Sequence, residues 1–384
     1  MRILISGAGI GGLALAQALS RGGHEVAVYE RDPSRQTRGQ GYRIHIDRNG
    51  NEALRACLPT EVLDLAHRTS GEAGDRVAFY TQDLVELSSQ VFPNIGGDEI
   101  TNVDRDTFRQ ALLTGVEVSF GHTVTGYELT PSGRVRVGIS TASPSSSISS
   151  GSSMGDGGSL IDEGDLLVGA DGVGSAVRRQ LAPSAALRDL GVRCLYGRMP
   201  LSGATLPPDF GRGFSWVAGA NGYGAGFAPV RFRTPTGVPD YLMTTLVAPT
   251  SVLGDLDVPS EALRQICVKA SATWHPAVRQ LFAAADPTSF FPIAIRAGTR
   301  VTPWSSGPVT LLGDAIHTMP PAGGVGANTA LQDAALLAKE LLSGKPLPEA
   351  VAAYESVMLP RGFDTIDSSV RMIGQMVPKS ETRP

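Results

Sequence analysis

The feature that most constrains the fold of this chain is a glycine-rich turn at residues 7–12, GAGIGG. The preceding segment, RILIS at 2–6, is a short apolar run of the kind found in buried parallel strands. Leucine and alanine then recur at helical spacing over 11–21, and EVAVYE at 25–30 is a second β-branched run. This order of strand, turn, helix and strand predicts a βαβ unit with a right-handed crossover.

The glycine spacing in this turn predicts a binding site for the pyrophosphate of a dinucleotide. In the pattern GxGxxG, Gly7 allows a tight turn, Gly9 lets the backbone approach the phosphates and Gly12 lets the helix pack closely on the strand. The helix N-terminus adds free N–H groups and a partial positive charge. Glu30 ends the next strand, where a carboxylate accepts hydrogen bonds from a ribose diol, although a surface glutamate after a glycine-rich turn is the alternative. The motif alone does not distinguish NAD from FAD.

Two later segments repeat the pattern of an apolar run that ends in a glycine–aspartate turn. GADG at 169–172 follows an apolar run and opens a helical segment that carries Arg178. GD at 313–314 follows VTLL and leads through PPAGGVGAN, at 320–328, into an alanine-rich helical segment.

Taken together, the three segments resemble those of the class A, or aromatic-hydroxylase-type, FAD-dependent monooxygenases, the family of para-hydroxybenzoate hydroxylase. They occur in the order typical of that family, and VDRDTF at 103–108 supplies a match to a family arginine at Arg105. The resemblance implies a non-covalently bound FAD, which NADPH or NADH reduces. It also implies a C4a-hydroperoxyflavin that inserts one oxygen atom from O2 into an aromatic or polycyclic small molecule. Hydroxylation, epoxidation and Baeyer–Villiger insertion are all open as outcomes, in secondary metabolism or aromatic catabolism.

The resemblance also implies which residues bind the cofactor. Glu30 binds the adenosine ribose, Arg105 lies against the FAD and Asp171 supports the pyrophosphate region. Asp314 hydrogen-bonds a ribityl hydroxyl, and a helix that starts near Gly324 points its positive end at the pyrimidine edge of the flavin. Ordinary turn aspartates are the alternative for Asp171 and Asp314. The implied cofactor-binding residues are Gly7, Gly9, Gly12, Glu30, Arg31, Arg105, Asp171, Asp314, Pro321, Gly324, Gly326, Ala327 and Asn328.

His317 follows Asp314 closely and therefore invites a catalytic or metal-binding interpretation. The chain has only 6 histidines, which do not cluster, and no further ligands lie at useful spacing. We therefore predict no metal site. In the resembled family this histidine belongs to the motif without acting as the chemical base, which implies a supporting role.

The segment GYRIHI, at 41–46, is predicted to be a strand in which Arg43 and His45 share one face. In the resembled family this segment passes close to the flavin and the substrate cavity. Contact of Arg43 with the flavin, contact with an anionic substrate group and a solvated sheet edge are all open. Candidates for the substrate cavity, with an ordinary core position as the alternative, are Trp216, Tyr223, Phe227 and Met243.

The pattern along the chain predicts an α/β protein with two domains. A Rossmann-like FAD-binding domain comprises 1–185 with 300–384, and a mostly β-sheet substrate domain at 186–299 interrupts it. C-terminal helices are expected near 324–342 and 346–358. Residues 143–159 have almost no apolar content and are predicted to form a flexible loop.

Composition limits the partners and the compartment. A net charge of −4 with 18% charged residues gives no basic excess for nucleic acid. No run reaches the roughly 18 apolar residues of a membrane span. Cys57, Cys194 and Cys267 form no metal or disulfide spacing, which favours a reducing, cytoplasmic location. We expect a monomer or homodimer whose partners are the small-molecule substrate and O2.

Three other functions compete with oxygen transfer. A flavin-dependent halogenase would carry the segment WxWxIP, which is missing around Trp216, Trp274 and Trp304. An FAD-bound cyclase or isomerase that performs no net redox chemistry is the main alternative, and a non-catalytic flavoprotein is another. The three intact motifs argue against the loss of flavin but do not prove that oxygen transfer occurs.

Overall fold

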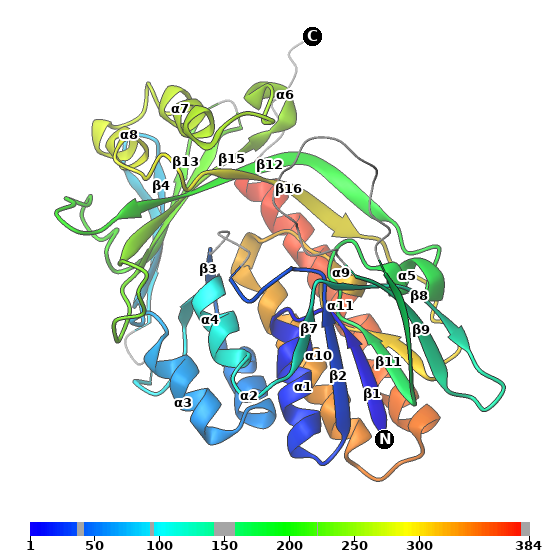
Figure 1. Ribbon diagram of the computed structural model, residues 1–384. Coiled ribbons are helices and arrows are strands. Elements are labelled where there is room, and N and C mark those ends of the chain that lie inside the picture. Colours follow the sequence, from blue (N-terminus) through cyan, green and yellow to red (C-terminus); the bar gives the residue numbers. More distant parts are fainter. Residues whose placement is uncertain (37–41, 93–95, 142–157, 221, 378–384) are drawn as a thin grey trace, which may run out of the picture.

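The computed structural model shows two layers of structure that meet across a long interface (Figure 1). A Rossmann-like α/β domain carries the N-terminus, and a large sheet lies above it in this view. Apart from its last two residues, the loop predicted at 143–159 lies outside the described part of the chain. The described residues are 1–36, 42–92, 96–141, 158–220 and 222–377.

The predicted βαβ unit is confirmed. Strand β1 pairs in parallel with β2, and helix α1 connects them. Their sheet has 5 parallel strands in the order β17-β11-β1-β2-β7, so β11 lies beside β1 and β17 beside β11, although both come from far along the chain. Ile3, Leu4 and Ile5 are fully buried because both faces of the sheet are covered, with α1 packed against β1 and a small antiparallel sheet also in contact with β1 and β2. The bounds are β1 Arg2–Ser6, α1 Ile10–Arg21, β2 Glu25–Glu30, β7 Val118–Phe120, β11 Leu166–Gly169 and β17 Val309–Leu311.

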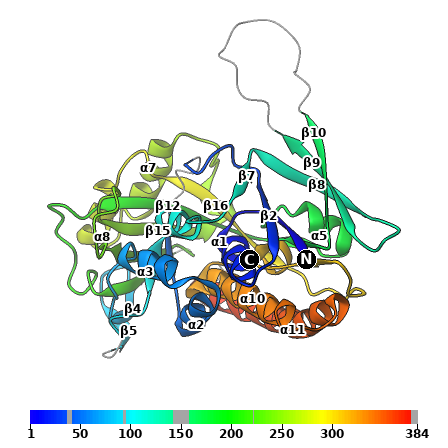
Figure 2. The same ribbon diagram turned by 60° about the horizontal axis from the view of Figure 1, so that its bottom comes forward.

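Helices and two small sheets complete the α/β domain. Figure 2 shows α10 and α11 side by side along it, and the sheet of β8, β9 and β10 projecting on another side. The short strands β3 and β6 form a two-stranded sheet below the large sheet (Figure 1). The helices are α2 Arg48–Cys57, α3 Thr60–Arg68, α4 Arg105–Leu112, α5 Ala176–Leu181, α9 Asp314–His317, the 3-10 turn η1 Ala322–Gly324, α10 Gly326–Leu341 and α11 Leu347–Met376. The strands are β3 Arg43–His45, β6 Asn102–Asp104, β8 His122–Leu129, β9 Val135–Thr141 and β10 Ser159–Gly164.

The predicted sheet-based middle region forms a 7-stranded sheet in the order β16-β12-β15-β14-β13-β4-β5. Its last two strands come from the N-terminal third of the chain, within the range assigned to the FAD-binding domain by sequence. They join the sheet because β4 pairs in parallel with β13. The strands are β4 Arg76–Thr81, β5 Glu86–Val91, β12 Leu187–Pro200, β13 Gly213–Ala218, β14 Gly224–Val230, β15 Tyr241–Pro249 and β16 Phe291–Gly298.

Alternation along these strands gives the 7-stranded sheet two different faces. The outer face packs against helices α6 to α8, with Leu242, Leu246 and Phe282 in one buried cluster. The face turned to the α/β domain, hereafter the inner face, carries Tyr241 and Met243 from the same strand, β15. These outer helices are α6 Thr250–Leu253, α7 Ser260–Ala270 and α8 Pro276–Ala283.

The last helix is longer than the sequence predicted. A helix was expected near 346–358, but α11 continues to Met376 although Pro360 lacks the N–H for the helical hydrogen bond. Apolar residues before and after the proline, Met358 and Phe363 among them, are buried in the same core. Their packing outweighs the lost hydrogen bond.

A buried ionic network ties the C-terminal helices together. His317 Nε2 lies 2.6 Å from Asp333 Oδ2, and Arg361 Nη2 donates to Asp333 Oδ1 at 2.7 Å, which joins α9, α10 and α11. Burial alone would lower the pKa of His317, but the Asp333 carboxylate outweighs it and raises that pKa. A Cβ at Gly362 would lie 2.5 Å from His317 Cδ2, so the ring fills the space that this glycine leaves. These contacts give His317 a role in packing.

We predict that this network makes stability depend on pH. A histidine whose pKa is raised in the folded state stabilises the fold fully below its unfolded pKa of about 6.5, and this stabilisation is lost as pH rises through the folded pKa. The difference in unfolding free energy between wild type and His317→Gln should therefore be largest near pH 5 to 6 and shrink at higher pH. Urea unfolding at several pH values measures it, and a difference that grows with pH would contradict the assignment.

Candidate functional site

The three glycines of GAGIGG stand in different surroundings. Gly7 has φ +107°, and a Cβ there would lie 2.4 Å from the carbonyl oxygen of Ala170. A Cβ at Gly12 would lie 2.2 Å from the carbonyl oxygen of Gly7. At Gly9, by contrast, a Cβ would meet none of the described atoms within 4 Å. Packing inside the protein therefore requires glycine at positions 7 and 12, whereas Gly9 faces open space at the N-terminus of α1.

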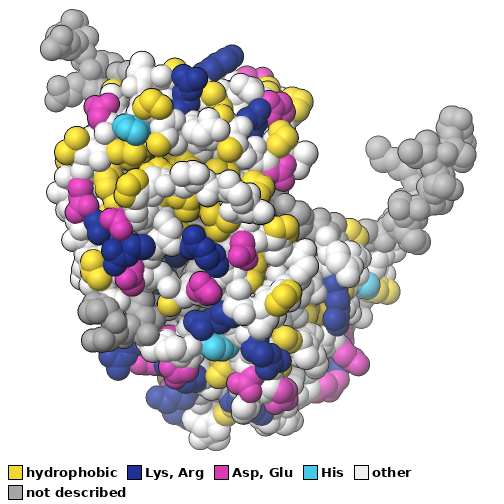
Figure 3. All heavy atoms as spheres, turned by 90° about the vertical axis from the view of Figure 1, so that its left-hand side faces the viewer, with side chains coloured by type: hydrophobic (Ala, Val, Ile, Leu, Met, Phe, Trp, Pro, Cys, Tyr) yellow, Lys and Arg dark blue, Asp and Glu magenta, His cyan; other side chains and the backbone are white. Residues whose placement is uncertain are grey.

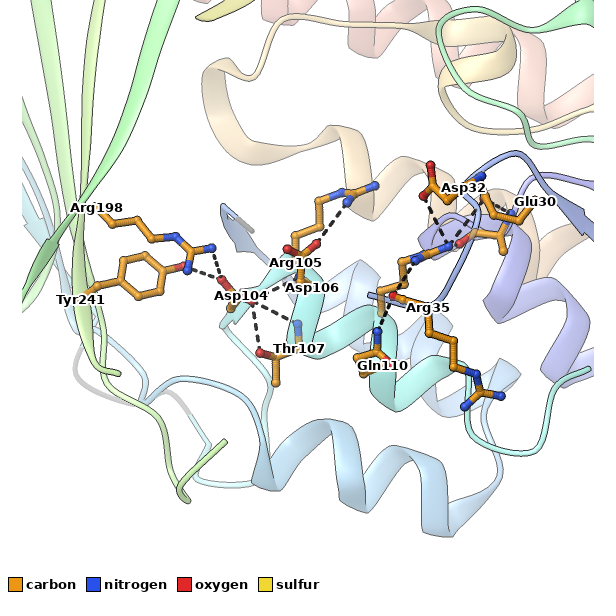
Figure 4. Close-up of polar contacts among 12 residues, drawn as sticks. Glu30, Asp32, Arg35, Asp104, Arg105, Asp106, Thr107, Gln110, Arg198 and Tyr241 are labelled. Carbon is orange, nitrogen blue, oxygen red and sulfur yellow. Dashed lines mark hydrogen bonds and ion pairs between the residues drawn. The ribbon is translucent and has the colours of Figure 1, made fainter. Parts of the chain in front are cut away.

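Glu30 is held against this turn by backbone N–H groups. Its carboxylate accepts hydrogen bonds from Ala8 N at 2.8 Å and from Asp32 N at 3.0 Å. Arg109 of α4 donates from Nε to the Ala8 carbonyl at 2.8 Å, and its Nη2 lies 3.7 Å from Glu30 (Figure 4). Arg105, one helical turn earlier in the same helix, was predicted to lie against the FAD, and Arg109 was not among the predicted residues. Nothing in the local pattern shows that Arg109 reaches the glycine turn.

Asp314 and Arg105 lie close enough to interact electrostatically, although they are far apart in sequence. Asp314 begins α9 and is exposed to solvent, yet burial among surrounding atoms raises its pKa, against the positive charges of His317 and Arg105. Arg105 begins α4, and its guanidinium lies over the ring of Tyr42, 5.6 Å from the ring centroid.

Asp171 and Arg178 belong to the second glycine–aspartate turn and the helix α5 that follows it. Asp171 Oδ2 accepts a hydrogen bond from Ala176 N at 2.8 Å, while Oδ1 is buried and has no partner among the residues described. Arg178 donates from Nη1 to the carbonyl of Ala315 at 2.8 Å and so holds α9, with Asp314, against α5. Arg178 therefore positions the segment that carries Asp314.

The glycine-rich turn before α10 packs against β3. Asn328 donates from Nδ2 to the His45 carbonyl at 2.9 Å and accepts at Oδ1 from Asp47 N at 3.0 Å. Its side chain is 1% exposed, so the amide serves to join the two segments. Gly324 has φ +66°, and a Cβ there would lie 3.1 Å from His45 Cβ. The other predicted residues of this turn, which are exposed or half-buried, are Pro321, Gly326 and Ala327.

His45 of β3 is held as a neutral ring. Its Nδ1 lies 2.9 Å from the Thr101 carbonyl, which can only accept, so Nδ1 carries the hydrogen. Burial and the charge of Arg43 lower the pKa of His45. A neutral ring protonated at Nδ1 leaves Nε2 as an acceptor. Arg31, also predicted from the resemblance, is exposed after β2.

Asp104 links the two layers at the N-terminus of α4, as Figure 4 shows. Its Oδ2 accepts from Arg198 Nη2 at 2.9 Å and from Tyr241 Oη at 3.0 Å, which belong to β12 and β15. Its Oδ1 accepts from Thr107 N at 3.1 Å and so caps the helix. Asp104 is fully buried, and the Arg198 guanidinium lies 4.5 Å from the centroid of the Tyr241 ring. Sequence reasoning missed this residue because its partners lie in distant strands.

Two of the four residues predicted for the substrate cavity lie on the inner face. Trp216 clusters with Ala322 of the turn before α10, and Met243 clusters with Tyr196 and Tyr241. Both face the α/β domain, as a residue of a cavity between the layers must.

The other two lie in the outer layer instead. Phe227 packs between Phe210 and Phe282, with ring centroids 5.5 Å from each. Tyr223 packs against the same cluster and donates to the Val252 carbonyl at 3.1 Å. Phe227 is directed outward because its neighbours in β14 take the inward positions. The Phe227 ring therefore packs in the core between the 7-stranded sheet and the outer helices.

The surface carries mixed charge. Figure 3, viewed from the left-hand side of Figure 1, shows basic and acidic side chains intermingled over the lower part of this face. Within the described ranges, no helix combines the length and apolar character needed to cross a bilayer.

Comparison with known proteins agrees with this geometry. Residues 5–52 match the NAD(P)-binding Rossmann-like domain, and residues 264–369 match the FAD binding domain family. A crystal structure of a protein described as an FAD-containing monooxygenase, from Photorhabdus luminescens, is 30% identical, with a TM-score of 0.83 over 99% of this chain and 100% of that one. The chain belongs to the class A FAD-dependent monooxygenase family.

Two curated relatives differ in how much of their length the chain covers. The dual O-methyltransferase/FAD-dependent monooxygenase CTB3 of Cercospora beticola is 30% identical over 97% of this chain, which spans only 46% of that protein. The aurachin C monooxygenase/isomerase of Stigmatella aurantiaca is 28% identical over 98% of this chain and 89% of that protein. The chain thus spans less than half of the fungal relative.

We predict that Asp104→Asn weakens the association of the two layers. Asparagine caps a helix as well as aspartate does, so the substitution removes mainly the charge that Arg198 and Tyr241 bind. Loss of one partner of a buried ion pair should lower the free energy of unfolding by about 3 kcal/mol. Urea unfolding measures this loss. Asp106→Asn, at the partly exposed neighbouring position, is the control and should change stability by less than about 0.5 kcal/mol.

Proposed function

We propose that this protein uses NADPH or NADH and O2 to insert one oxygen atom into an aromatic or polycyclic small molecule, with FAD as its cofactor. The observation that carries the proposal is the meeting of three turns at one sheet edge. GAGIGG follows β1, GADG follows β11 and GD follows β17. Since β1, β11 and β17 are adjacent and parallel, their carboxyl ends meet where open α/β sheets bind ligands.

The residues at this edge fit a dinucleotide. Gly9 leaves room for phosphates beside the N–H groups of α1, and Glu30 is placed for a ribose diol. Asp171 Oδ1 is a buried acceptor that lacks a partner within the described ranges. Asp314 presents an exposed carboxylate near Arg105, where it can accept hydrogen bonds from a polyhydroxyl chain.

Bound FAD would supply the electron transfer from NADPH or NADH to O2 and the transfer of oxygen to the substrate. The chain's own residues would orient the substrate and exclude water from it. The inner face of the 7-stranded sheet covers the turn before α10, and Trp216 packs with Ala322 of that turn. Neutral His45, which packs against Gly324, offers a ring nitrogen as acceptor at the same place.

The substrate class rests on the inner face and on the relatives. Tyr196 and Phe291 stack with ring centroids 5.3 Å apart, next to Tyr42 of the α/β domain. Aromatic walls of this kind favour a planar ligand. A cyclase or isomerase without net redox chemistry is the second candidate, because one relative carries both monooxygenase and isomerase in its name.

We predict that Gly9→Ala and Asp314→Ala each weaken FAD binding roughly 10- to 100-fold without unfolding the protein, because one blocks the approach of the phosphates and the other removes a charged acceptor. Flavin fluorescence during titration of the apoprotein measures the affinity. Gly307→Ala is the matched control, since a Cβ there also meets none of the described atoms within 4 Å. Unchanged affinity in both site variants would contradict this map of the site.

We predict that at least one compound in a panel of aromatic and polycyclic candidate substrates increases the rate at which the FAD-loaded protein consumes NADPH or NADH. Product formed under 18O2 should then carry one 18O atom, as mass spectrometry detects. Turnover that yields unlabelled product would favour the isomerase or cyclase. Comparison of NADPH with NADH in the same assay identifies the reductant.

A further inference from the structure

Arg43 lies where the α/β domain meets the inner face of the 7-stranded sheet. Its backbone N donates to the hydroxyl of Tyr196 on β12 at 2.7 Å, which places β3 directly against the sheet. The side chains of Tyr196 and Tyr241 lie close enough to the Arg43 guanidinium to interact with it electrostatically. Arg43 therefore points to the region between the two layers.

The guanidinium of Arg43 has no counter-ion in the described part of the chain. Its Nε is buried without a hydrogen-bond partner, and no ion pair or hydrogen bond of its side chain is present among these residues. Burial lowers the pKa of Arg43, as expected for a cation removed from water without an anion beside it.

The carboxylate best placed by strand register is already bound elsewhere. Asp104 stands opposite Arg43 in the antiparallel pair of β3 and β6. Its Oδ2 instead accepts from Arg198 at 2.9 Å and from Tyr241 at 3.0 Å. Arg198 is paired with this acid, whereas no ion pair of Arg43 is present in the described part of the chain. The Arg43 side chain is half-buried with its Nε enclosed, and an anionic ligand would offset the cost of removing this cation from water.

The surroundings indicate which ligand would bring the anion. The proposed phosphate position lies at Gly9, where Arg109 and the Glu30 carboxylate are already placed. Arg43 stands instead beside Tyr196, whose ring stacks with Phe291 and lies 5.9 Å from the ring of Tyr42. A cation beside a cluster of aromatic rings suits the charged end of a flat aromatic molecule.

We propose that Arg43 is the binding residue for an anionic oxygen of the substrate, so that the substrate is an aromatic anion whose rings lie along the inner face. This inference rests on the proposed function and narrows its substrate class. Two parallel N–H groups of a guanidinium match the two oxygens of a carboxylate. The same contact fixes the orientation of the ring system relative to the turn before α10.

The test uses the FAD-loaded protein and two probes of the same shape, 2-naphthoate and its neutral amide, 2-naphthamide. Isothermal titration and the change in flavin absorbance each measure their binding without turnover. Wild type should bind 2-naphthoate at least about 10-fold more tightly than the amide, because a charge-assisted hydrogen bond is involved. Arg43→Met should abolish this preference while leaving the affinity for the amide and the FAD content unchanged. Arg43→Lys should retain part of it, since the charge remains.

Arg48→Met is the matched control, because Arg48 is exposed on the adjacent helix and pairs with Glu52; it should keep the full preference. A wild-type protein that binds 2-naphthoate no better than the amide would overturn the inference. So would an Arg43→Met variant that keeps the preference, or one that loses FAD instead of the anion. If the product carries 18O but the preference for 2-naphthoate over 2-naphthamide does not depend on Arg43, this inference is refuted and the proposed function stands. A protein that cannot be loaded with FAD would refute the proposed function as well.

Discussion

The parallel pairing of β1 with β2 and β11, and of β11 with β17, is the constraint on which the rest of the structure depends. Because parallel strands end at the same edge, the pairing gathers three turns that are far apart in sequence. Gly7 and Gly12 allow the first turn to pack on the second within van der Waals limits. This close contact also keeps the N-terminus of α1 at the edge, with Gly9 open in front of it. The proposed cofactor site is thus a consequence of backbone geometry.

The second constraint is the buried carboxylate of Asp104. It caps α4 and at the same time binds Arg198 and Tyr241 of the large sheet, so one group sets both the position of Arg105 and the docking of the sheet. A fully buried acid that accepts from several donors is satisfied and cannot serve another cation. Because Asp104 binds Arg198 and Tyr241, Arg43 has no carboxylate partner in the described part of the chain.

Much of the fold was predictable because its signals are local. The βαβ unit, the interruption by a sheet-based region and the helix before Leu341 follow from apolar periodicity and glycine spacing, and the structure agrees with them. The contribution of β4 and β5 to the large sheet was not predictable, since it depends on pairing with β13 across more than a hundred residues. The length of α11 was missed because burial on both sides of Pro360 outweighs a local helix-breaking rule.

The candidate site, like the fold, has some features that the sequence predicts and others that depend on tertiary contacts. The sequence by itself determined that a glycine turn, two glycine–aspartate turns and an arginine before a helix are present, because each is a short pattern with its own backbone chemistry. Only the tertiary structure decided which side chains meet: Arg109 lies against Glu30, and Phe227 lies in the outer core rather than on the inner face. It also decided that Arg198 binds the carboxylate of Asp104, while Arg43 has no carboxylate partner in the described part of the chain. Charge compensation is a property of three-dimensional neighbours, and no local pattern encodes which of two arginines a distant acid will bind.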